Sequence, residues 1–535
     1  MDKRAGRILV VEDRPQWQKV LSENLQRDGY LVDTVSTSAQ ARECLQTNFY
    51  HLVILDIRLD ESDQTNTEGM SLLDELNASL GTSVAIIMLS GYGTKDQMRS
   101  AFRNFKVMDF LEKQHFDNVK FRQQVQQLFA TEIPINLGLK VFWHNGYKFD
   151  DVVLNLKINQ YRVEAGTTLQ KRAAIELEDL LCRLFNEAKE LIIKPMRSGY
   201  SGAGVLQIQP FFENGGGQAV VVKFGDVRKI DEEYRNFQAH VKPFVGGGRR
   251  TAALNLRRTA NLGGITYSLL GTEGMQEHFG DFYQHASVSE IKEVINNLFR
   301  NTCGAWYANP GKLQPQYLNA DYEDLMGFTL GRIKQIVQNE LKSVEVTDRI
   351  YFKNLDEERS FKDPIVTLTG KHLVRPTYIC TTHGDLNGNN ILVDERRQVW
   401  LIDFQHTKPS HILRDVANLD AVVRFQLLQA DDASLIERLA MEESLCNIQH
   451  FSHIEDVTAN FTTDNPALAK AYAISLHLRQ IARQLVAQNP SDDFSEYHIA
   501  ALYQAFYHVR LNTLISEQRE HALLSASLII EQLDV

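Results

Sequence analysis

One stretch in the second half of the chain combines acidic and amide side chains at a spacing that suits phosphoryl transfer. It has the sequence HGDLNGNNILVD over residues 383–394, and a second acid, Asp403, follows an apolar run. Asp385 would accept or orient the proton of an attacking hydroxyl, while Asn390 and Asp403 would hold Mg²⁺ against nucleotide phosphates, because Mg²⁺ prefers oxygen ligands. The alternative is a chance loop beside a buried aspartate.

This motif resembles the signature of the aminoglycoside and choline phosphotransferases, the small-molecule branch of the protein-kinase-like fold. The resemblance covers roughly residues 170–530. Protein kinases carry Arg before the catalytic Asp, whereas this chain has Gly384, and Asn387 stands where the small-molecule branch often has His. The resemblance implies a bilobal domain that binds ATP and Mg²⁺ and phosphorylates a hydroxyl group.

A Gly-rich segment upstream is a candidate for binding the nucleotide. It spans residues 198–205, and backbone N–H groups in such a turn, here at Ser201 and Gly202, can lie over phosphates. Gly/Ser turns are common, so an ordinary turn is the alternative. A predicted strand over Ile265–Leu270 leads to residues 271–273, where we expect the adenine to dock through backbone hydrogen bonds.

A lysine at the end of a strand belongs to the same resemblance. The apolar run at 219–222 ends in Lys223, which matches the strand-borne lysine that contacts the α- and β-phosphates in kinases. The next segment predicts a helix, and we expect Glu233 on it to pair with this lysine, with Glu232 as the alternative. Asp415 matches a later acid of the family pattern, and we expect it to brace the loop around Asp385.

Acidic side chains also gather in the first 132 residues. Apolar strands alternate there with amphipathic helices, which predicts a parallel, doubly wound sheet of flavodoxin-like type with its site at the carboxyl ends of the strands. The predicted strands are Arg7–Val11, Val32–Val35, His51–Leu55, Val84–Leu89 and Val107–Leu111, and a helix over Phe116–Ala130 follows. Glu12 and Asp13 come directly after the first strand and Asp56 after the third.

This arrangement resembles the receiver domain of two-component response regulators. The resemblance implies that Asp56 is the phosphoacceptor and acts as a carboxylate nucleophile. It also implies a Mg²⁺ site formed by three carboxylates and one backbone carbonyl, those of Glu12, Asp13, Asp56 and Arg58. Lys113 would pair with the acyl phosphate, Ser90 would hydrogen-bond to it and Phe110 would turn inward. A domain that folds but is never phosphorylated is the alternative.

The chain divides into four predicted parts and has a multidomain α/β plus α+β fold class. The receiver domain occupies 1–132, a connector with a possible small β extension 133–168, the nucleotide lobe 169–272 and the helical lobe 273–535. The detailed expectations are strands near 139–143 and at Val152–Ile158, a turn at Asn145-Gly146, and helices at Leu169–Leu191, Pro466–Ala487 and Glu496–Ile515. Asn465 should cap the helix that starts at Pro466.

Composition limits the classes of protein to which the chain can belong. Hydrophobic residues make up 43% and charged residues 23% of the sequence, as in ordinary soluble globular proteins. Apolar runs stay shorter than a membrane span and a signal-peptide pattern is absent, so we expect a cytoplasmic protein without membrane contact. The net charge of −11 argues against direct DNA binding. Five scattered cysteines predict reduced thiols.

These features predict a response regulator whose output is an ATP-dependent phosphotransferase. We expect a cognate sensor histidine kinase to phosphorylate Asp56, which would alter lobe closure or promote a homodimer through the receiver. The acceptor would be an unidentified small molecule or a protein. Two other functions remain open, a protein kinase and a nucleotide-binding, pseudokinase-like scaffold that transfers no phosphate.

Overall fold

The computed structural model describes eleven stretches of the chain, namely residues 4–59, 68–80, 84–90, 107–133, 135–196, 202–244, 251–269, 276–308, 310–355, 359–456 and 460–533. They belong to two compact units. Unit 1 comprises Met1–Tyr234 and Ala253–Ser268, and unit 2 comprises Arg235–Ala252 and Leu269–Val535. Across the described stretches, none of the helices combines the length and apolar character that a bilayer span requires.

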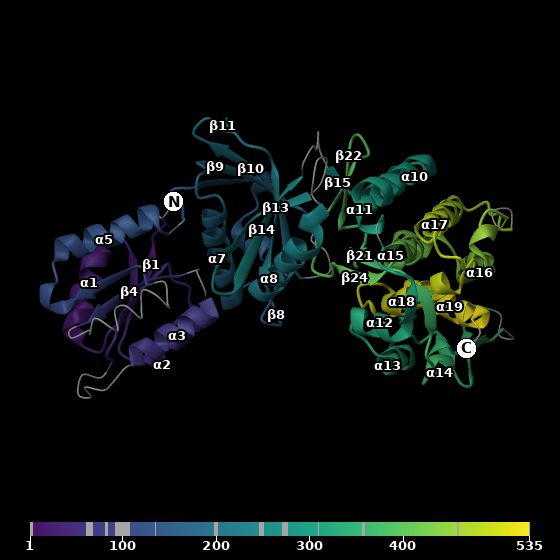
Figure 1. The fold of residues 1–535 in the computed structure, drawn as a ribbon, viewed down its shortest axis with the longest axis horizontal. Helices are drawn as coiled ribbons and strands as arrows, with labels where there is room; N and C mark the ends of the chain where they lie inside the picture. Colours follow the sequence, from purple (N-terminus) through teal and green to yellow (C-terminus); the bar gives the residue numbers. More distant parts are fainter. Residues whose placement is uncertain are drawn as a thin grey trace. The chain divides into compact units, whose positions relative to one another are not determined.

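The first sheet of unit 1, in which Figure 1 labels β1 and β4, is parallel and five-stranded, in the order β2-β1-β3-β4-β5. Its strands are β1 (Arg7–Val11), β2 (Leu31–Val35), β3 (Leu52–Asp56), β4 (Ala85–Ser90) and β5 (Asp109–Glu112). Alternate side chains of β1 and β3 enter two separate apolar cores because neighbouring residues of a strand face opposite sides. Helices α2 (Ser38–Thr47) and α3 (Glu68–Leu80) cover one side, and α1 (Pro15–Arg27) and α5 (Asn118–Thr131) cover the other. The predicted doubly wound parallel sheet is confirmed.

The second sheet of unit 1 has the order β13-β14-β12-β10-β9-β6, with β11 paired to β10. Its strands are β6 (Lys140–Trp143), β9 (Glu190–Met196), β10 (Gly204–Phe212), β11 (Gly215–Gly216), β12 (Val220–Asp226), β13 (Thr251–Arg258) and β14 (Leu262–Leu269). Helix α7 (Thr168–Leu184) packs its apolar side, which includes Leu177 and Leu181, onto this sheet. Helix α8 (Val227–Asn236) follows β12 directly.

The connector contributes an edge strand to the second sheet, since β6 pairs in parallel with β9. The strand predicted at Val152–Ile158 is wrong, because this segment holds the end of the short helix α6 (Phe149–Val152), a turn and only two residues of β7 (Lys157–Ile158). The Asp151 carboxylate accepts the Lys148 N–H at 2.8 Å and so starts that helix. Strand β7 pairs with β8 (Tyr161–Arg162).

The helix predicted at Leu169–Leu191 is too long. Helix α7 ends at Leu184, and the residues from Glu190 onward form β9, which lies between β10 and β6. The sequence between them, Phe-Asn-Glu-Ala-Lys, ends in good helix formers, but strand pairing on both sides of β9 outweighs this weak local preference.

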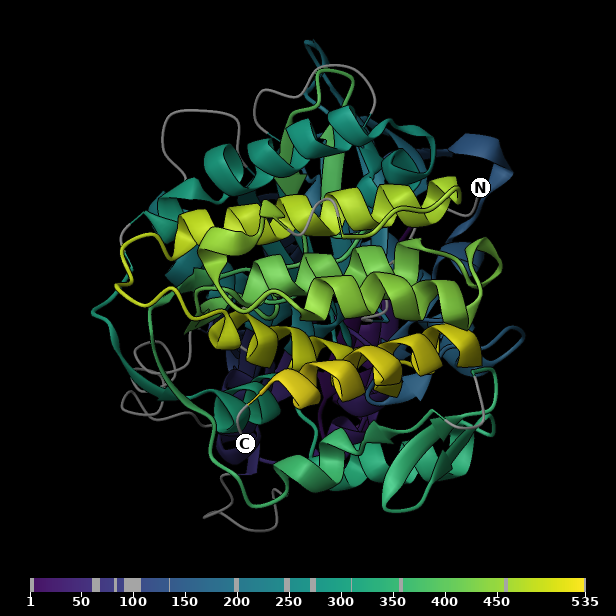
Figure 2. The ribbon, with the colours of Figure 1, turned by 90° about the vertical axis from the view of Figure 1, so that its right-hand side faces the viewer.

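Unit 2 is mainly helical. Its helices are α9 (Phe279–His285), α10 (Val288–Asn296), α11 (Gly304–Tyr307), α12 (Leu318–Met326), α13 (Leu330–Glu340), α14 (Pro364–Leu368), α15 (Arg414–Val422), α16 (Leu435–Cys446), α17 (Pro466–Leu485), α18 (Ser495–Arg510) and α19 (Ser516–Gln532). Helix α15 packs against α17 and α18, and α18 lies beside α19, the two yellow helices of Figure 2. The Asn465 side chain accepts the N–H groups of Ala467 and Leu468 at 3.1 and 3.2 Å, so the predicted cap is confirmed.

Short strand pairs complete unit 2 and carry its polar loops. They are β15 (Gln276–His278) with β22 (Ile391–Asp394) and β23 (Val399–Leu401), β16 (Gln314–Tyr317) with β20 (Val374–Thr377), β17 (Val344–Val346) with β18 (Arg349–Phe352) and β19 (Phe361–Lys362), and β21 (Ile379–Thr382) with β24 (Lys408–His411). Helix α19 was not predicted, because it is buried all around from Gln518 to Ile530 and therefore has no one-sided apolar stripe.

Three buried histidines make the stability of unit 2 sensitive to acid. Burial lowers the pKa of His498 to about 3, and it lowers the pKa values of His508 and His521 to about 4. An unfolded histidine titrates near 6.5, so the unfolded chain binds more protons between about pH 6.5 and 4. The free energy of unfolding should therefore fall by about 1.4 kcal/mol per pH unit for each histidine as the pH drops through this window.

Urea unfolding of the full chain at several pH values between 7 and 4.5 tests this. His508→Gln should remove part of the pH dependence, because glutamine does not titrate. The exposed His453 provides the control, and His453→Gln should leave the slope unchanged. An equally steep loss of stability in the His508→Gln protein would contradict the assignment.

Candidate functional site

Three carboxylates meet at the carboxyl edge of the first sheet. Glu12 and Asp13 follow β1 directly, and Asp56 is the last residue of the adjacent parallel strand β3. One oxygen from each of the three carboxylates lies within 4.8 Å of the other two. The predicted juxtaposition of these acids is therefore present in the structure.

Lys113 supplies the positive charge at this edge. It follows β5, and its ammonium lies 2.7 Å from Asp56 Oδ2 and 2.8 Å from Glu12 Oε2. All three side chains are almost completely buried. The Trp17 ring centroid lies 5.6 Å from the same ammonium, in a cation–π contact.

The charges at this edge suit a divalent cation. Burial raises the pKa of Asp56, and burial together with the Asp56 charge raises the pKa of Glu12 to about 7. Asp13 Oδ1 is buried and has no hydrogen-bond partner among the described residues. One ammonium cannot balance three carboxylates in a site of low dielectric, whereas a Mg²⁺ ion with oxygen ligands would do so.

The other receiver residues lie around this cluster. The Arg58 N–H donates to Asp56 Oδ1 at 3.4 Å, which places the Arg58 backbone beside the phosphoacceptor candidate. Phe110 lies in β5 and packs partly buried against one of the two cores of the first sheet. Ser90 ends β4, next to β5, and its side chain lies outside the described part of the chain.

A buried hydrogen bond joins the first sheet to α7. His51, which precedes β3, places Nε2 2.6 Å from Asp179 on α7, and both side chains are almost fully buried. His51 Nδ1 accepts the Arg7 N–H at 2.8 Å, so Nε2 carries the proton and donates to the carboxylate. Burial opposes ionisation, but Arg183 and His51 outweigh it and hold the pKa of Asp179 well below its usual value.

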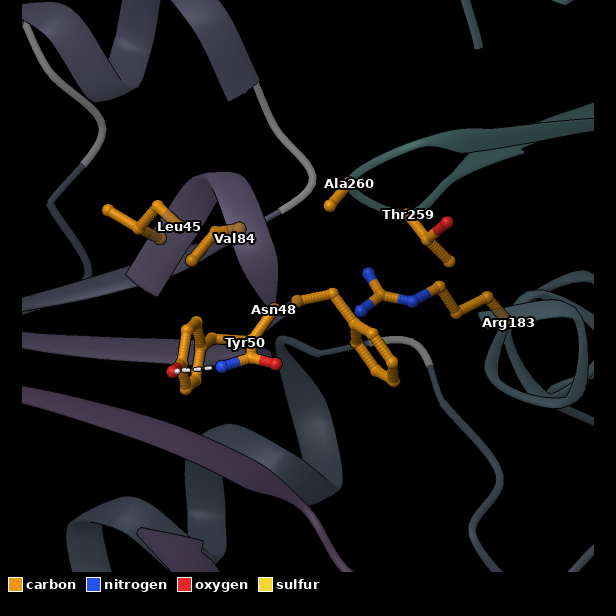
Figure 3. A pocket seen from close by; sticks show the side chains of 8 residues that line it. Leu45, Asn48, Tyr50, Val84, Arg183, Thr259 and Ala260 are labelled. Atoms are coloured by element: carbon orange, nitrogen blue, oxygen red, sulfur yellow. Dashed lines mark hydrogen bonds between the residues drawn. The ribbon is translucent and has the colours of Figure 1, made fainter. Parts of the chain in front are cut away.

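A narrow crevice lies beside Arg183, whose guanidinium pairs with Asp179 (Figure 3). Arg183 extends from α7 toward the segment around Asn48 and Tyr50, and Thr259 and Ala260 close the other side. The crevice has a volume of about 10 Å³, which is roughly the space of one water molecule. We therefore consider it a packed junction and not a ligand site.

In the second sheet, Lys223 and Glu233 form the expected pair. Lys223 on β12 places Nζ 2.7 Å from Glu233 Oε2 on α8, and Tyr267 donates its hydroxyl to Glu233 Oε1 at 2.7 Å. Both charged side chains are almost fully buried. The pairing thus involves Glu233 and not the alternative, Glu232. Buried pairs of this kind need a second hydrogen bond on the carboxylate, which Tyr267 provides.

The Gly-rich turn is described only from Gly202, and Ser201 lies outside the described residues. Gly202 has a left-handed φ of +77°, and a Cβ at this position would lie 2.8 Å from Lys157 Cγ. Its carbonyl accepts the Lys157 N–H at 2.9 Å. The contact with β7 of the connector is therefore sufficient to explain a glycine here.

One buried carboxylate holds the loop that contains Asp385. Asp415, in the first turn of α15, accepts the backbone N–H groups of His383 and Gly384 at 2.7 and 2.8 Å. Tyr307 donates its hydroxyl to the same carboxylate at 2.8 Å. The His383 ring contacts the Ile402 carbonyl at 3.1 Å. Asp415 therefore braces the loop, as the sequence predicts, and the His383 ring adds a second contact.

Two amides orient the Asp385 carboxylate. Asn390 Nδ2 donates to Asp385 Oδ2 at 3.0 Å and to the Asp385 carbonyl at 2.9 Å, and Asn387 Nδ2 donates to Oδ2 at 3.1 Å. Asn387 stands where histidine is frequent in the family that the motif resembles, and in this chain it takes part in orienting the acid. With the Asn390 amide nitrogen engaged, its oxygen is the atom that can serve as a metal ligand.

Asp403 follows β23 and has an uncommon backbone conformation, with φ at +69°. The Ile402 N–H donates to the Asn390 carbonyl at 3.0 Å, so the end of this strand pairs with the loop. A non-glycine residue in the left-handed region is held there by its surroundings, and such residues concentrate at functional sites.

Arg414 is a neighbour of this loop that the sequence analysis did not single out. Its Nη2 donates to the Gly384 carbonyl at 3.0 Å, and its side chain is 3% exposed. A Cβ on Gly384 would lie 2.4 Å from the His406 carbonyl, so this position with φ of +84° requires glycine. The only sequence signal for Arg414 is that it directly precedes Asp415.

Residues 188–350 and 354–509 match the family described as ternary complex associated domain 9. This match covers more than half of the 535 residues. The chain belongs to this family. The ternary complex associated domain thus includes Lys223, Glu233 and the loop around Asp385.

Residues 8–126 match the response regulator receiver domain. This chain of the ternary complex associated domain 9 family therefore also contains a receiver domain, and Asp56 ends the third strand of that domain. Known signalling proteins are similar in sequence to part of this chain. The hybrid signal transduction histidine kinase B of Dictyostelium discoideum is 30% identical over 121 residues, which are 21% of this chain and 6% of that protein. The transcriptional regulatory protein GlrR of Escherichia coli is 31% identical over 94 residues, which are 18% of this chain and 20% of that protein.

Solved structures of receiver domains are similar to the receiver domain of this chain. The receiver domain of a sensor histidine kinase from Pseudomonas aeruginosa, with a magnesium ion in its active site cleft, is 26% identical and covers 24% of this chain and 99% of that chain, with a TM-score of 0.21. The response regulator TrrA of Thermotoga maritima, in complex with Mg²⁺-BeF, is 28% identical. The match covers 23% of this chain and 98% of that chain, with a TM-score of 0.20.

Mg²⁺ should bind at the three carboxylates. Because Trp17 contacts Lys113 at this cluster, a Mg²⁺ titration followed by tryptophan fluorescence should give a saturable signal that the Trp17→Phe variant lacks. Asp13→Asn removes one ligand and should weaken Mg²⁺ binding by about tenfold or more, since tenfold corresponds to about 1.4 kcal/mol.

Asp74 on α3 is exposed and provides the matched control. Asp74→Asn should bind Mg²⁺ like the unchanged protein. Equal affinities for the Asp13→Asn protein and the unchanged protein would show that Asp13 is not a ligand.

Proposed function

We propose that the chain is a response regulator whose phosphorylation at Asp56 controls an ATP- and Mg²⁺-dependent phosphotransferase acting on a hydroxyl group. A sensor histidine kinase would be the phosphodonor for Asp56, because receiver domains exchange phosphoryl groups with such kinases. The observation that carries the proposal is the loop around Asp385, in which Asn390 and Asn387 orient one carboxylate and Asp415 fixes the backbone.

Asp385 is suited to act on the acceptor hydroxyl. Its Oδ2 is held by two amide donors, so the carboxylate has a fixed direction in which to accept a proton from an attacking hydroxyl. Positioning of this kind is the main contribution that a protein makes to phosphoryl transfer, because the transition state is loose and needs little covalent help.

Two further sets of side chains support nucleotide binding. Lys223 is held by Glu233 and would contact phosphates of ATP, as the strand-borne lysine of kinases does. Asn390 and Asp403 offer an amide and a carboxylate oxygen, which is a donor set that fits Mg²⁺. When bound, Mg²⁺ would neutralise the charge on the phosphates.

The contact between the receiver and α7 supports regulation. His51 directly precedes β3, the strand that ends at Asp56, and its ring bonds to Asp179 on α7. Helix α7 packs on the sheet that carries Lys223. Asp56 is therefore connected to the second sheet through a short series of packed residues. Phosphorylation would act by favouring one of two arrangements of the contact between His51 and Asp179.

A signalling scaffold that binds nucleotide without transferring phosphate is the second candidate. The family description, which names association with a ternary complex, favours it. The two functions differ in the role of Asp385. A scaffold needs no proton acceptor, whereas a phosphotransferase does.

ATP turnover by the full chain with Mg²⁺ tests the proposal, with a panel of hydroxylated metabolites, aminoglycosides and a generic protein substrate as acceptors. Asp385→Asn should lower turnover by about 10²-fold or more, in the range of general base catalysis, and leave ATP binding unchanged. Lys223→Met should lower the rate of turnover and also weaken ATP binding.

The exposed Lys171 of α7 offers a control, and Lys171→Met should behave like the unchanged protein. Labelling of protein in place of a metabolite would favour a protein kinase. ATP binding without turnover, equal in the unchanged and Asp385→Asn proteins, would overturn the phosphotransferase and support the scaffold.

A further inference from the structure

A cavity in unit 2 opens directly beside Asp385. Helix α15 contributes Arg414 and Asn418 to its wall, and α18 contributes Gln504, Tyr507 and Arg510. Its volume is about 100 Å³. This volume is well above the roughly 10–15 Å³ that a cavity needs to hold one water molecule.

The charges that line the cavity are mostly positive. Arg414 and Arg510 lie on its wall, and Asp385 is the one carboxylate among the residues that line it. Arg414 donates to the Gly384 carbonyl, and Arg510 donates to the Met326 and Gly327 carbonyls at 3.0 and 3.2 Å. Within the described stretches, neither guanidinium forms an ion pair with a carboxylate. The positive charge is thus available to a ligand.

Buried polar atoms on the same wall have no partner among the described residues. They are Arg414 Nε, Asn418 Oδ1 and Gln504 Nε2, on side chains that are 3%, 5% and 1% exposed. Asn418 Nδ2 donates to Gln504 Oε1 at 3.0 Å, so this amide pair leaves one acceptor and one donor unused. Buried polar groups are nearly always hydrogen-bonded, and such a set indicates a ligand with both donor and acceptor atoms.

We propose that this cavity binds a small hydroxylated anion, whose carboxylate or phosphate contacts Arg414 and Arg510 and whose hydroxyl groups contact Asn418, Gln504 and Asp385. The assignment of this anion as the phosphoryl acceptor rests on the proposed function, whereas its binding does not. Guanidinium groups match carboxylate and phosphate oxygens in bidentate geometry. The same charges disfavour cationic alcohols such as aminoglycosides and choline, which are the acceptors of the family that the Asp385 motif resembles.

Binding to the full chain, measured by isothermal titration without nucleotide, tests the site. The probes are glycerate, glycerol 3-phosphate, neutral glycerol and cationic choline. At least one of the two anions should bind about tenfold or more tightly than glycerol and choline, and the comparison of the anions distinguishes a carboxylate from a phosphate ligand. Failure of both anions to bind, or equal binding of glycerol, overturns the proposal.

Variants separate charge from packing. Arg510→Gln should weaken anion binding by about tenfold or more, and Arg510→Lys should retain most of it. Asn418→Asp keeps the side-chain shape and adds a negative charge to the wall of the cavity. This variant should therefore also bind the anion more weakly. The exposed Arg332 on α13 is the matched control, since Arg332→Gln should change nothing. Unchanged anion binding in both Arg510→Gln and Asn418→Asp overturns the site.

The outcomes for the site and for the proposed function are distinct. If anion binding depends on Arg510 but no bound probe is phosphorylated, the result supports the binding site and counts against the phosphotransferase. Transfer of phosphate to choline or an aminoglycoside, with no anion binding, keeps the phosphotransferase and overturns the site.

Discussion

Asp415 is the group on which the arrangement around Asp385 depends. Its buried carboxylate accepts two backbone N–H groups of the loop and one tyrosine hydroxyl, all between 2.7 and 2.8 Å. Hydrogen bonds to a charged group contribute about 1.5–3 kcal/mol each, so the loop is fixed more firmly than a surface turn. The direction of Asp385, the left-handed bend at Gly384 and the position of Arg414 beside the cavity all follow from this anchor.

The receiver site and the cavity beside Asp385 differ in the sign of their excess charge. The receiver site concentrates carboxylates around the single cation of Lys113 and therefore favours a metal ion, whereas the cavity beside Asp385 concentrates guanidinium groups and favours an anion. The two sites use one physical rule. A buried group without a charge partner inside the protein is a group that a ligand can satisfy, because the desolvation cost is already part of the folded state.

The sequence was sufficient to predict the parts that depend on local pattern. Continuous apolar strands placed Glu12 and Asp56 at one edge, and the Asn465 cap followed from its neighbours. Features set by tertiary pairing were missed. The end of α7 depends on strand β9 pairing at both sides, and α19 has no apolar stripe because neighbours surround it. The cavity residues Gln504 and Arg510 lie more than 100 positions after Asp385, and no spacing rule connects them to it.

We propose that one chain couples the receiver to a phosphotransferase. The most direct test is the rate of ATP turnover by the full chain with and without a beryllofluoride mimic of phosphorylated Asp56, in the unchanged protein and in Asp56→Asn. We expect the mimic to change the rate of the unchanged protein by about twofold or more and to leave the rate of Asp56→Asn unaffected, because only the intact carboxylate binds the mimic. Turnover that is identical with and without the mimic in the unchanged protein would contradict it.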